Sequence, residues 1–161
     1  MQRDRFLTGI LAGIGALVLL ALILFFIRDR NVDYVDDSTP AGVVQNYTLA
    51  LQRRDYERAY SYLATSGGAE PVTMERFLQH FSSYGGDEAA RTTIEIGETI
   101  QLSGDQASVQ VTLIRSSGGI FDGTYRQTEN ATLRRENGLW KITNAPYPLW
   151  DYGWDFPAPP K

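Results

Sequence analysis

The stretch TIEIGETIQLSGDQASVQVTLI, residues 93–114, decides the fold class, because apolar residues recur in it with a period of two. The alternating residues are Ile94, Ile96, Ile100 and Leu102 before the centre, and Ala107, Val109, Val111 and Leu113 after it. Between them lies Ser-Gly-Asp at 103–105, a combination typical of turns. Since successive side chains of a strand point to opposite faces, the stretch predicts two half-buried antiparallel strands.

Further strand signals follow toward the C-terminus. A long strand is predicted from Ile120 to Arg135, after a break at residues 116–119. Asn137-Gly138 is a strong signal for a tight hairpin turn before residues 139–142. The second half of the chain therefore predicts a sheet of four antiparallel strands.

Three amphipathic helices are predicted before this sheet. Thr39 followed by Pro40 marks the first helix, because the hydroxyl caps free backbone amides and Pro fits the first turn. Asp55 is expected to cap the second helix and Thr73 the third, which ends before Gly85. We therefore expect an α+β domain over residues 39–147, with three helices packed on a four-stranded antiparallel sheet.

The N-terminal part contains 22 consecutive residues without charge, from Phe6 to Ile27. A helix of this length spans roughly 33 Å, enough for a hydrocarbon core of about 30 Å. The segment ends in large apolar residues rather than a small-residue cleavage site, and it lacks the polar stripe of a buried helix. We expect a short tail at 1–5, an uncleaved transmembrane helix at 6–27 and a polar spacer at 28–38.

The expected orientation is a cytoplasmic N-terminus and an extracytoplasmic C-terminal domain. Two arginines precede the span and two follow it, so their positive charges are equal. The free N-terminal amino group adds one positive charge before the span, which favours a cytoplasmic N-terminus. Gly9, Gly13 and Ala16 share one face of the helix, a pattern that allows a helix-helix contact in the membrane; the alternative is that these small residues are incidental. The expected partners are the lipid bilayer and other membrane protein subunits.

Composition excludes several function classes. The 161 residues carry a formal net charge of -4 and no basic cluster, so nucleic acid is not an expected partner. The chain has no Cys, which excludes thiolate catalysis, disulfides and iron–sulfur clusters. The single His, His80, cannot form a metal site alone and is expected at the surface or at a rim. We therefore expect no metal, no cofactor and no catalytic residues.

Three motifs occur in a characteristic order: TPAGVV at 39–44, DYERAY at 55–60 and GLWKI at 138–142. In this order they resemble the nuclear-transport-factor-2-like (cystatin-like) superfamily, most closely its bacterial membrane-anchored members of unknown function. The resemblance covers residues 39–145 and implies a cone-shaped domain in which a curved sheet wraps around the helices. The superfamily includes dehydratases, isomerases and non-enzymatic binding or assembly domains, and no catalytic set carries over residue by residue.

Strand parity indicates a ligand pocket inside such a cone. Its candidate residues are Tyr47, Tyr60, Glu98, Tyr125 and Glu129. If the two carboxylates point inward, burial would raise their pKa values and suit them to proton transfer. The alternative is a β-bulge, which adds one residue and would turn them toward water.

Aromatic residues alternate with polar ones in the C-terminal tail, residues 148–161. The aromatic residues are Trp150, Tyr152, Trp154 and Phe156. An extended tail would place all four on one side, where they could bind a partner. The alternative is that the tail folds back and completes the core of its own domain.

Two functions follow from these features. The first is a membrane-anchored, extracytoplasmic, non-enzymatic binding or assembly module, such as an accessory subunit of a membrane protein complex. The second is a tethered enzyme of the dehydratase or isomerase type with a small apolar ligand. We favour the first, because no catalytic constellation is evident; a closed pocket containing Glu98 or Glu129 would favour the second.

Overall fold

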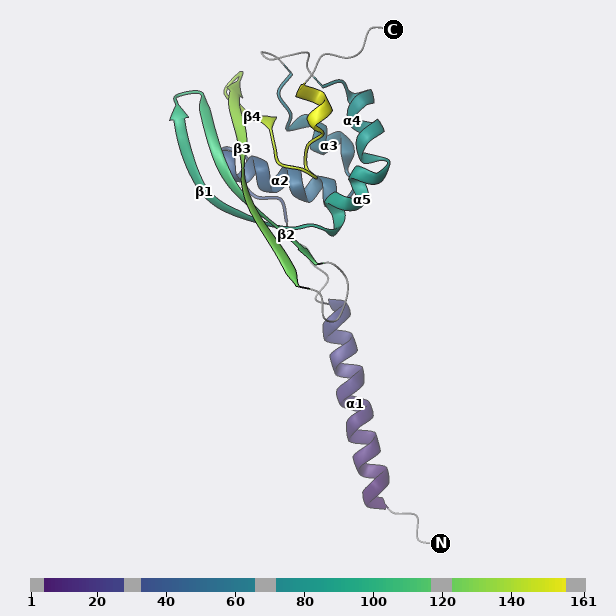
Figure 1. The fold of residues 1–161 in the computed structure, drawn as a ribbon. Helices are drawn as coiled ribbons and strands as arrows, with labels where there is room; N and C mark the ends of the chain where they lie inside the picture. Colours follow the sequence, from purple (N-terminus) through teal and green to yellow (C-terminus); the bar gives the residue numbers. More distant parts are fainter. Residues whose placement is uncertain (1–4, 28–32, 66–71, 117–122, 156–161) are drawn as a thin grey trace. The chain divides into compact units, whose positions relative to one another are not determined.

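The computed structural model describes residues 5–27, 33–65, 72–116 and 123–155 (Figure 1). The chain divides into two units, Met1–Asp33 and Tyr34–Lys161. The first unit holds helix α1 (Arg5–Ile27). The elements of the second unit are α2 (Pro40–Gln52), α3 (Tyr56–Ser61), α4 (Met74–Phe81), α5 (Tyr84–Arg91), β1 (Thr93–Ser103), β2 (Gln106–Ser116), β3 (Thr124–Glu136), β4 (Leu139–Asn144) and the 3-10 helix η1 (Tyr152–Asp155).

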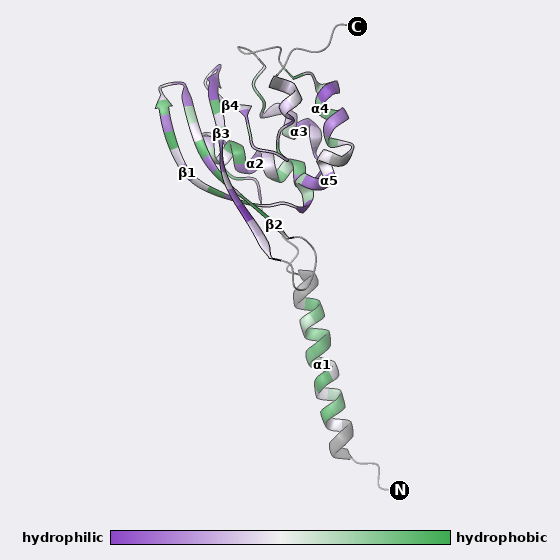
Figure 2. Ribbon diagram, in the orientation of Figure 1, coloured by the Kyte–Doolittle hydropathy of each residue, from purple (hydrophilic) through white to green (hydrophobic). Residues whose placement is uncertain are grey.

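Helix α1 corrects the membrane prediction. Most of its coloured residues are hydrophobic in Figure 2, but its side chains are described only from Gly9 to Ile23. Within the described residues, no helix combines the length and apolar character needed to cross a membrane. This finding contradicts the transmembrane helix predicted at 6–27.

The predicted localisation depended on that helix and is contradicted with it. It comprised a single-pass membrane protein, a cytoplasmic N-terminus and an extracytoplasmic domain. Gly9, Gly13 and Ala16 lie exposed on α1, and a Cβ added at either glycine would meet no described atom within 4 Å. The structure does not test the helix-helix contact predicted for this face, which stays a prediction.

The predicted helix starts of the second unit are confirmed. Thr39 accepts a hydrogen bond from the backbone N–H of Gly42 at 3.1 Å, and Pro40 occupies the first turn of α2. Asp55 caps α3 and Thr73 caps α4 in the same way. These caps depend on residues three positions apart, which is why the local sequence predicts them.

Helix α5 was not predicted, so the expectation of three helices is wrong. Gly85 and Gly86 lie inside α5 rather than ending the preceding helix. A Cβ at Gly86 would lie 1.9 Å from the backbone oxygen of Phe81, so only glycine lets α5 approach the end of α4 this closely. The second unit therefore has four α-helices within the described residues.

The predicted four-stranded antiparallel sheet is confirmed, with the order β1-β2-β3-β4. The β3–β4 turn uses Asn137 and Gly138 at φ values of 53° and 84°, as a tight hairpin requires. Figure 1 shows helices α2 to α5 on one side of the curved sheet. The buried side of the sheet contributes the following core residues: Ala107, Val109, Val111, Leu113, Ala131, Leu133, Trp140 and Ile142.

One β-bulge changes the facing of β1. Ile96 pairs with Val111 and Thr99 with Val109, so β1 has one extra residue between these pairs. Beyond the bulge, Ile100 pairs with Ser108 and turns to the outer face of the sheet. Ile100 is 54% exposed and Leu102 61% exposed, which contradicts the single apolar face predicted for this strand.

The second unit begins before the first cap, at Tyr34. The side-chain amide of Asn46 on α2 both accepts from the N–H and donates to the carbonyl of Val35, each at 2.8 Å. Asn46 is 1% exposed. The guanidinium groups of Arg53 and Arg58 lie over the ring of Tyr34 at 5.1 and 3.4 Å. These contacts attach residues 34–37, which we call the N-terminal segment, to the helices.

Candidate functional site

Two of the three tyrosines predicted for the pocket, Tyr47 and Tyr60, have structural roles. Tyr47 is completely buried, and its hydroxyl donates to the backbone carbonyl of Leu149 at 2.5 Å. Burial raises the pKa of Tyr47 well above its ordinary value, so the phenol stays neutral. The Tyr60 hydroxyl donates to the carbonyl of Val72 at 2.9 Å. Both hydroxyls therefore stabilise neighbouring backbone.

The remaining predicted pocket residues lie elsewhere. Glu98 is exposed beside the bulge in β1, and Tyr125 is 60% exposed at the start of β3. Glu129 is half-buried and accepts a hydrogen bond from Gln127 of the same strand. Strand β2 separates the two glutamates, so the structure does not bring them together.

The C-terminal segment, residues 149–155, folds back onto the domain. Trp150 and Trp154 are each 4% exposed, and their ring centroids are 5.0 Å apart. Trp154 also packs against Phe77 and Phe81 of α4, at 5.8 and 5.9 Å. The segment is not extended, because Tyr152–Asp155 form η1, in which Trp154 is buried while Tyr152 is half exposed.

The other two aromatic residues of the tail differ from the tryptophans. Tyr152 is 50% exposed, and Phe156 lies outside the described residues. Trp150 and Trp154 belong to the core, as the fold-back alternative requires. Of the described tail aromatics, Tyr152 alone presents a large exposed surface.

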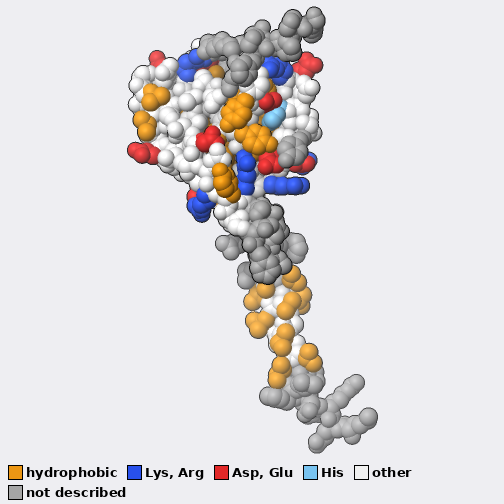
Figure 3. Space-filling view, in the orientation of Figure 1, with side chains coloured by type: hydrophobic (Ala, Val, Ile, Leu, Met, Phe, Trp, Pro, Cys, Tyr) orange, Lys and Arg blue, Asp and Glu red, His pale blue; other side chains and the backbone are white. Residues whose placement is uncertain are grey.

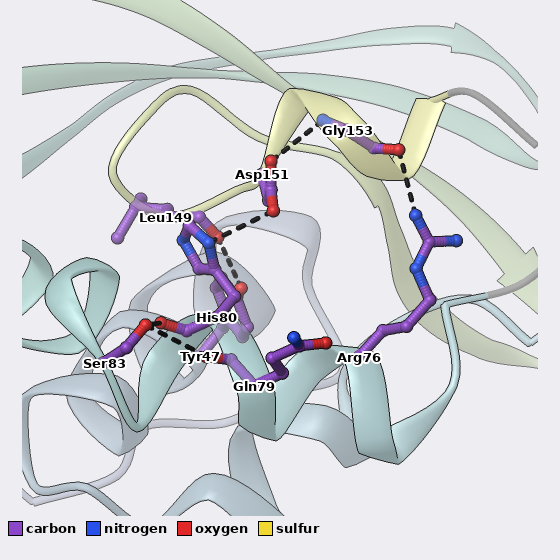
Figure 4. Close-up of polar contacts among 8 residues, drawn as sticks. All are labelled: Tyr47, Arg76, Gln79, His80, Ser83, Leu149, Asp151 and Gly153. Carbon is purple, nitrogen blue, oxygen red and sulfur yellow. Dashed lines mark hydrogen bonds and ion pairs between the residues drawn. The ribbon is translucent and has the colours of Figure 1, made fainter. Parts of the chain in front are cut away.

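His80 and Asp151 form the main ionisable pair of this region (Figure 4). The distance from His80 Nδ1 to Asp151 Oδ2 is 3.2 Å, and 16% of the His80 side chain is exposed. The imidazole makes edge contacts with the rings of Phe81 and Trp154, at 4.7 and 5.5 Å. Figure 3 shows this histidine at the surface beside acidic and hydrophobic side chains. The pair links α4 to the C-terminal segment.

The second nitrogen of His80 faces protein. Nε2 is buried and has no hydrogen-bond partner among the described residues. A Cβ added to Gly85 would lie 2.4 Å from Nε2, so the ring occupies space that only a glycine leaves open. A general base would have to present this nitrogen to a substrate. In this geometry it contacts the start of α5 instead.

Burial sets the protonation state of His80. Desolvation lowers its pKa below the ordinary value of 6.5, and the carboxylate of Asp151 opposes this shift by raising it. Since desolvation is the larger cause, the imidazole is neutral at neutral pH. The pair acts as a hydrogen-bonded contact between α4 and the C-terminal segment.

Two further polar contacts hold the same region. Arg76 Nη2 donates to the carbonyl of Gly153 at 3.0 Å, and Asp151 Oδ1 accepts from the N–H of Gly153 at 2.9 Å (Figure 4). At the end of α4, the Ser83 hydroxyl lies within hydrogen-bond distance of the carbonyls of Gln79 and His80. The sequence alone did not indicate the His80–Asp151 pair, because the two residues are far apart in the chain. The only signal was the row of aromatic residues in the tail, which indicated that the tail could pack against its own domain.

Among the described side chains, no group of three or more His, Asp or Glu residues is arranged to hold a metal ion.

Comparisons with known proteins give similarities of fold only. No protein-family model and no curated protein matches the chain. A ketosteroid isomerase-like protein from Erwinia carotovora atroseptica has 17% identity and a TM-score of 0.49, over 71% of this chain and 92% of that one. An NTF-2 like protein of unknown function from Shewanella oneidensis has 15% identity and a TM-score of 0.46, over 63% and 88%.

A third solved structure is an NTF2-like protein with a cystatin-like fold from Novosphingobium aromaticivorans. It has 15% identity and a TM-score of 0.45, over 77% of this chain and 83% of that one. Structures described as NTF2-like or cystatin-like are therefore among those similar to this chain. At these identities and TM-scores they do not decide its activity. The narrower resemblance to membrane-anchored members has no support in these comparisons.

Proposed function

We propose that the second unit is a non-enzymatic binding or assembly module that engages another protein through the outer edge of β1. The observation that carries this proposal is the difference between the two edges of the sheet. On the β4 edge, Ile142 donates to the carbonyl of Tyr62 at 2.9 Å and accepts from the N–H of Ala64 at 2.8 Å. The chain thus covers β4 with its own segment.

The β1 edge is different. β1 has 11 residues, and no strand of the described chain pairs with its outer side. An uncovered edge offers a row of backbone donors and acceptors to an extended segment of a partner. Ile100 and Leu102 add exposed apolar side chains at the hairpin end, where Figure 3 shows hydrophobic groups at the upper left. This combination fits a protein that adds a strand to the sheet.

A pocket of about 270 Å³ lies on the sheet at the hairpin end of β1. Only Leu102 of its lining belongs to β1, and the other lining residues lie on β2, β3 and β4. The proposal therefore rests on the free edge and its exposed apolar side chains, not on this pocket.

The filled interior argues against the enzymatic alternative. The space between α2, α4 and the sheet contains Tyr47, Phe77 and Phe81, each at most 1% exposed. Glu98 and Glu129, the proposed acid and base, line neither the pocket at Leu102 nor a second pocket between α3 and β4. Proton transfer on an apolar ligand requires such groups inside an enclosed site.

Charge substitution at the β1 edge tests the proposal. The Ile100→Lys/Leu102→Lys variant and a control, Leu78→Lys, would be purified under gentle conditions, and proteins recovered with each would be quantified by mass spectrometry. Leu78 is the control because it is an exposed apolar residue on α4, away from the β1 edge and outside both pockets. We expect the β1 variant to lose a partner that the control retains, and that partner to crosslink to residues of β1 in the unmodified protein. Equal recovery with both variants would contradict the proposal.

A further inference from the structure

A second pocket lies between α3 and β4. Its volume is about 280 Å³, close to the lower limit of roughly 300 Å³ for small-molecule sites. Its lining residues are Asp37, Val43, Arg58, Ser61, Tyr62, Leu139, Trp140 and Lys141. This α3–β4 pocket is independent of the β1 edge, and its size restricts it to a small ligand.

The α3–β4 pocket combines an apolar floor with a charged rim. Val43, Tyr62 and Trp140 form the floor, with exposed fractions of 1%, 6% and 4%. Arg58 is exposed and Lys141 half-buried at the rim. A ligand that fits both parts has an apolar body and a charged group at one end.

The two rim cations lie near acidic residues but form no ion pairs with them: Asp37 lines the same pocket, and Asp55 interacts electrostatically with Arg58. Among the residues that the structure describes, neither Arg58 nor Lys141 forms an ion pair. Unpaired cations beside apolar surface attract an anion, and hydrogen bonds between charged partners are stronger than neutral ones. Asp37 also lines the pocket, so the net formal charge of its lining is +1. A ligand with one negative charge neutralises this lining, whereas a ligand with two would leave a net negative charge in the pocket.

Both cations are held in position before a ligand arrives. The Arg58 guanidinium lies 3.4 Å from the centre of the Tyr34 ring, and its Nε donates to the Tyr62 hydroxyl at 3.3 Å. Lys141 Nζ donates to the backbone carbonyl of Ser61 and keeps further N–H groups for a ligand. Groups that are already ordered lose less conformational entropy on binding.

We propose that the α3–β4 pocket binds a small organic monocarboxylate. Arg58 and Lys141 bind the carboxylate, and the apolar body of the ligand lies against Tyr62, Leu139 and Trp140. No chemical step is involved, since the pocket supplies recognition only.

Nuclear magnetic resonance titration of the full chain tests this proposal. The probes are phenylacetate, which carries a carboxylate on an apolar ring, and phenylacetamide, its neutral counterpart of similar shape. We expect phenylacetate to cause saturable shifts of the Trp140 indole N–H and the Lys141 amide. Loss of a charge-assisted hydrogen bond corresponds to about 10- to 100-fold in affinity, so phenylacetamide should bind that much more weakly. Equal binding of both probes, or shifts that do not saturate, would overturn the proposal.

Substitutions sharpen the same measurement. Lys141→Met keeps the aliphatic stem and removes the charge, and should weaken phenylacetate binding about tenfold or more. Arg126→Gln is the matched control, because Arg126 pairs with Glu95 on β1 and does not line the pocket. Equal affinities of these two variants would overturn the proposal.

Asp37→Asn provides an independent variant on an exposed side chain. It removes a negative charge from the rim, so phenylacetate should bind at least as tightly as to the unmodified protein. Weaker binding would show that the pocket recognises a zwitterion through Asp37, which contradicts a simple monocarboxylate site. This test remains available if Lys141→Met fails to fold.

Discussion

Two adjacent residues of α2 hold the two ends of the second unit by different physical means. Asn46 binds the backbone of Val35 through two amide hydrogen bonds, while the Tyr47 hydroxyl binds the carbonyl of Leu149. The N-terminal segment is otherwise attached by cations over Tyr34, near the surface. The C-terminal segment is attached by buried tryptophans.

This difference predicts that the two segments contribute differently to the stability of the domain. Val35 is 40% exposed, so water can replace its lost hydrogen bonds if the N-terminal segment detaches. Trp150 and Trp154 fill the space above α4, and water cannot replace their packing. We therefore expect the N-terminal segment to detach locally and the C-terminal segment to unfold with the domain. Four substitutions test this comparison.

Trp154→Ala should have the largest effect. It removes a buried aromatic side chain that contacts Phe77, Phe81 and Trp150, so the free energy of unfolding should fall by about 3 to 5 kcal/mol. Urea denaturation followed by circular dichroism measures this change. Tyr152→Ala is the control, since Tyr152 is 50% exposed, and should cost less than about 1 kcal/mol. Similar losses in both would show that the C-terminal segment is not part of the core.

Asn46→Ala should lower the free energy of unfolding by about 2 kcal/mol, because it removes both hydrogen bonds to the backbone of Val35. The N–H and carbonyl of Val35 are partly exposed and would then bind water. The informative measurement is hydrogen exchange. We expect the Val35 amide to lose protection while the amides of β2 keep theirs. If protection falls equally in β2, the N-terminal segment does not detach locally.

Tyr47→Phe should cost about 1 kcal/mol, since it keeps the buried ring and removes only the hydrogen bond to Leu149. Thermal unfolding should shift to a lower midpoint, with the Trp154 environment retained in the near-ultraviolet circular dichroism. Tyr60→Phe is a matched control whose hydroxyl binds Val72 rather than the C-terminal segment. A near-ultraviolet change in Tyr47→Phe alone would show that one hydrogen bond, rather than tryptophan burial, positions the segment.

His80 should give the smallest effect, visible as a dependence of stability on pH. Its pKa is lowered in the folded state by burial, so the unfolded chain binds more protons near the ordinary value of 6.5. The free energy of unfolding should therefore decrease as pH falls below about 6.5, and this loss should level off once the folded state is also protonated. In His80→Gln the decrease over this pH range should be smaller; an unchanged slope would exclude His80 as its source.

Much of the architecture could be predicted because its signals are local. Thr39, Asp55 and Thr73 begin their helices with side chains that reach three residues ahead. Asn137-Gly138 adopts the positive φ angles that few other pairs tolerate. The candidate site was less predictable: the sequence pattern predicts Tyr47 in a ligand pocket, but its hydroxyl donates to the backbone carbonyl of Leu149, which is 102 residues away in the chain.

By itself, the sequence determined the α+β class, the helix caps, the order of four strands and the buried face of β2. These follow from chemistry within a few residues and from the period of the apolar pattern. Tertiary structure alone decided the bulge that exposes Glu98 and Ile100, the α5 helix across Gly85 and Gly86, and the pairing of His80 with Asp151. Each depends on close approach between distant segments, where available space and burial outweigh local preference.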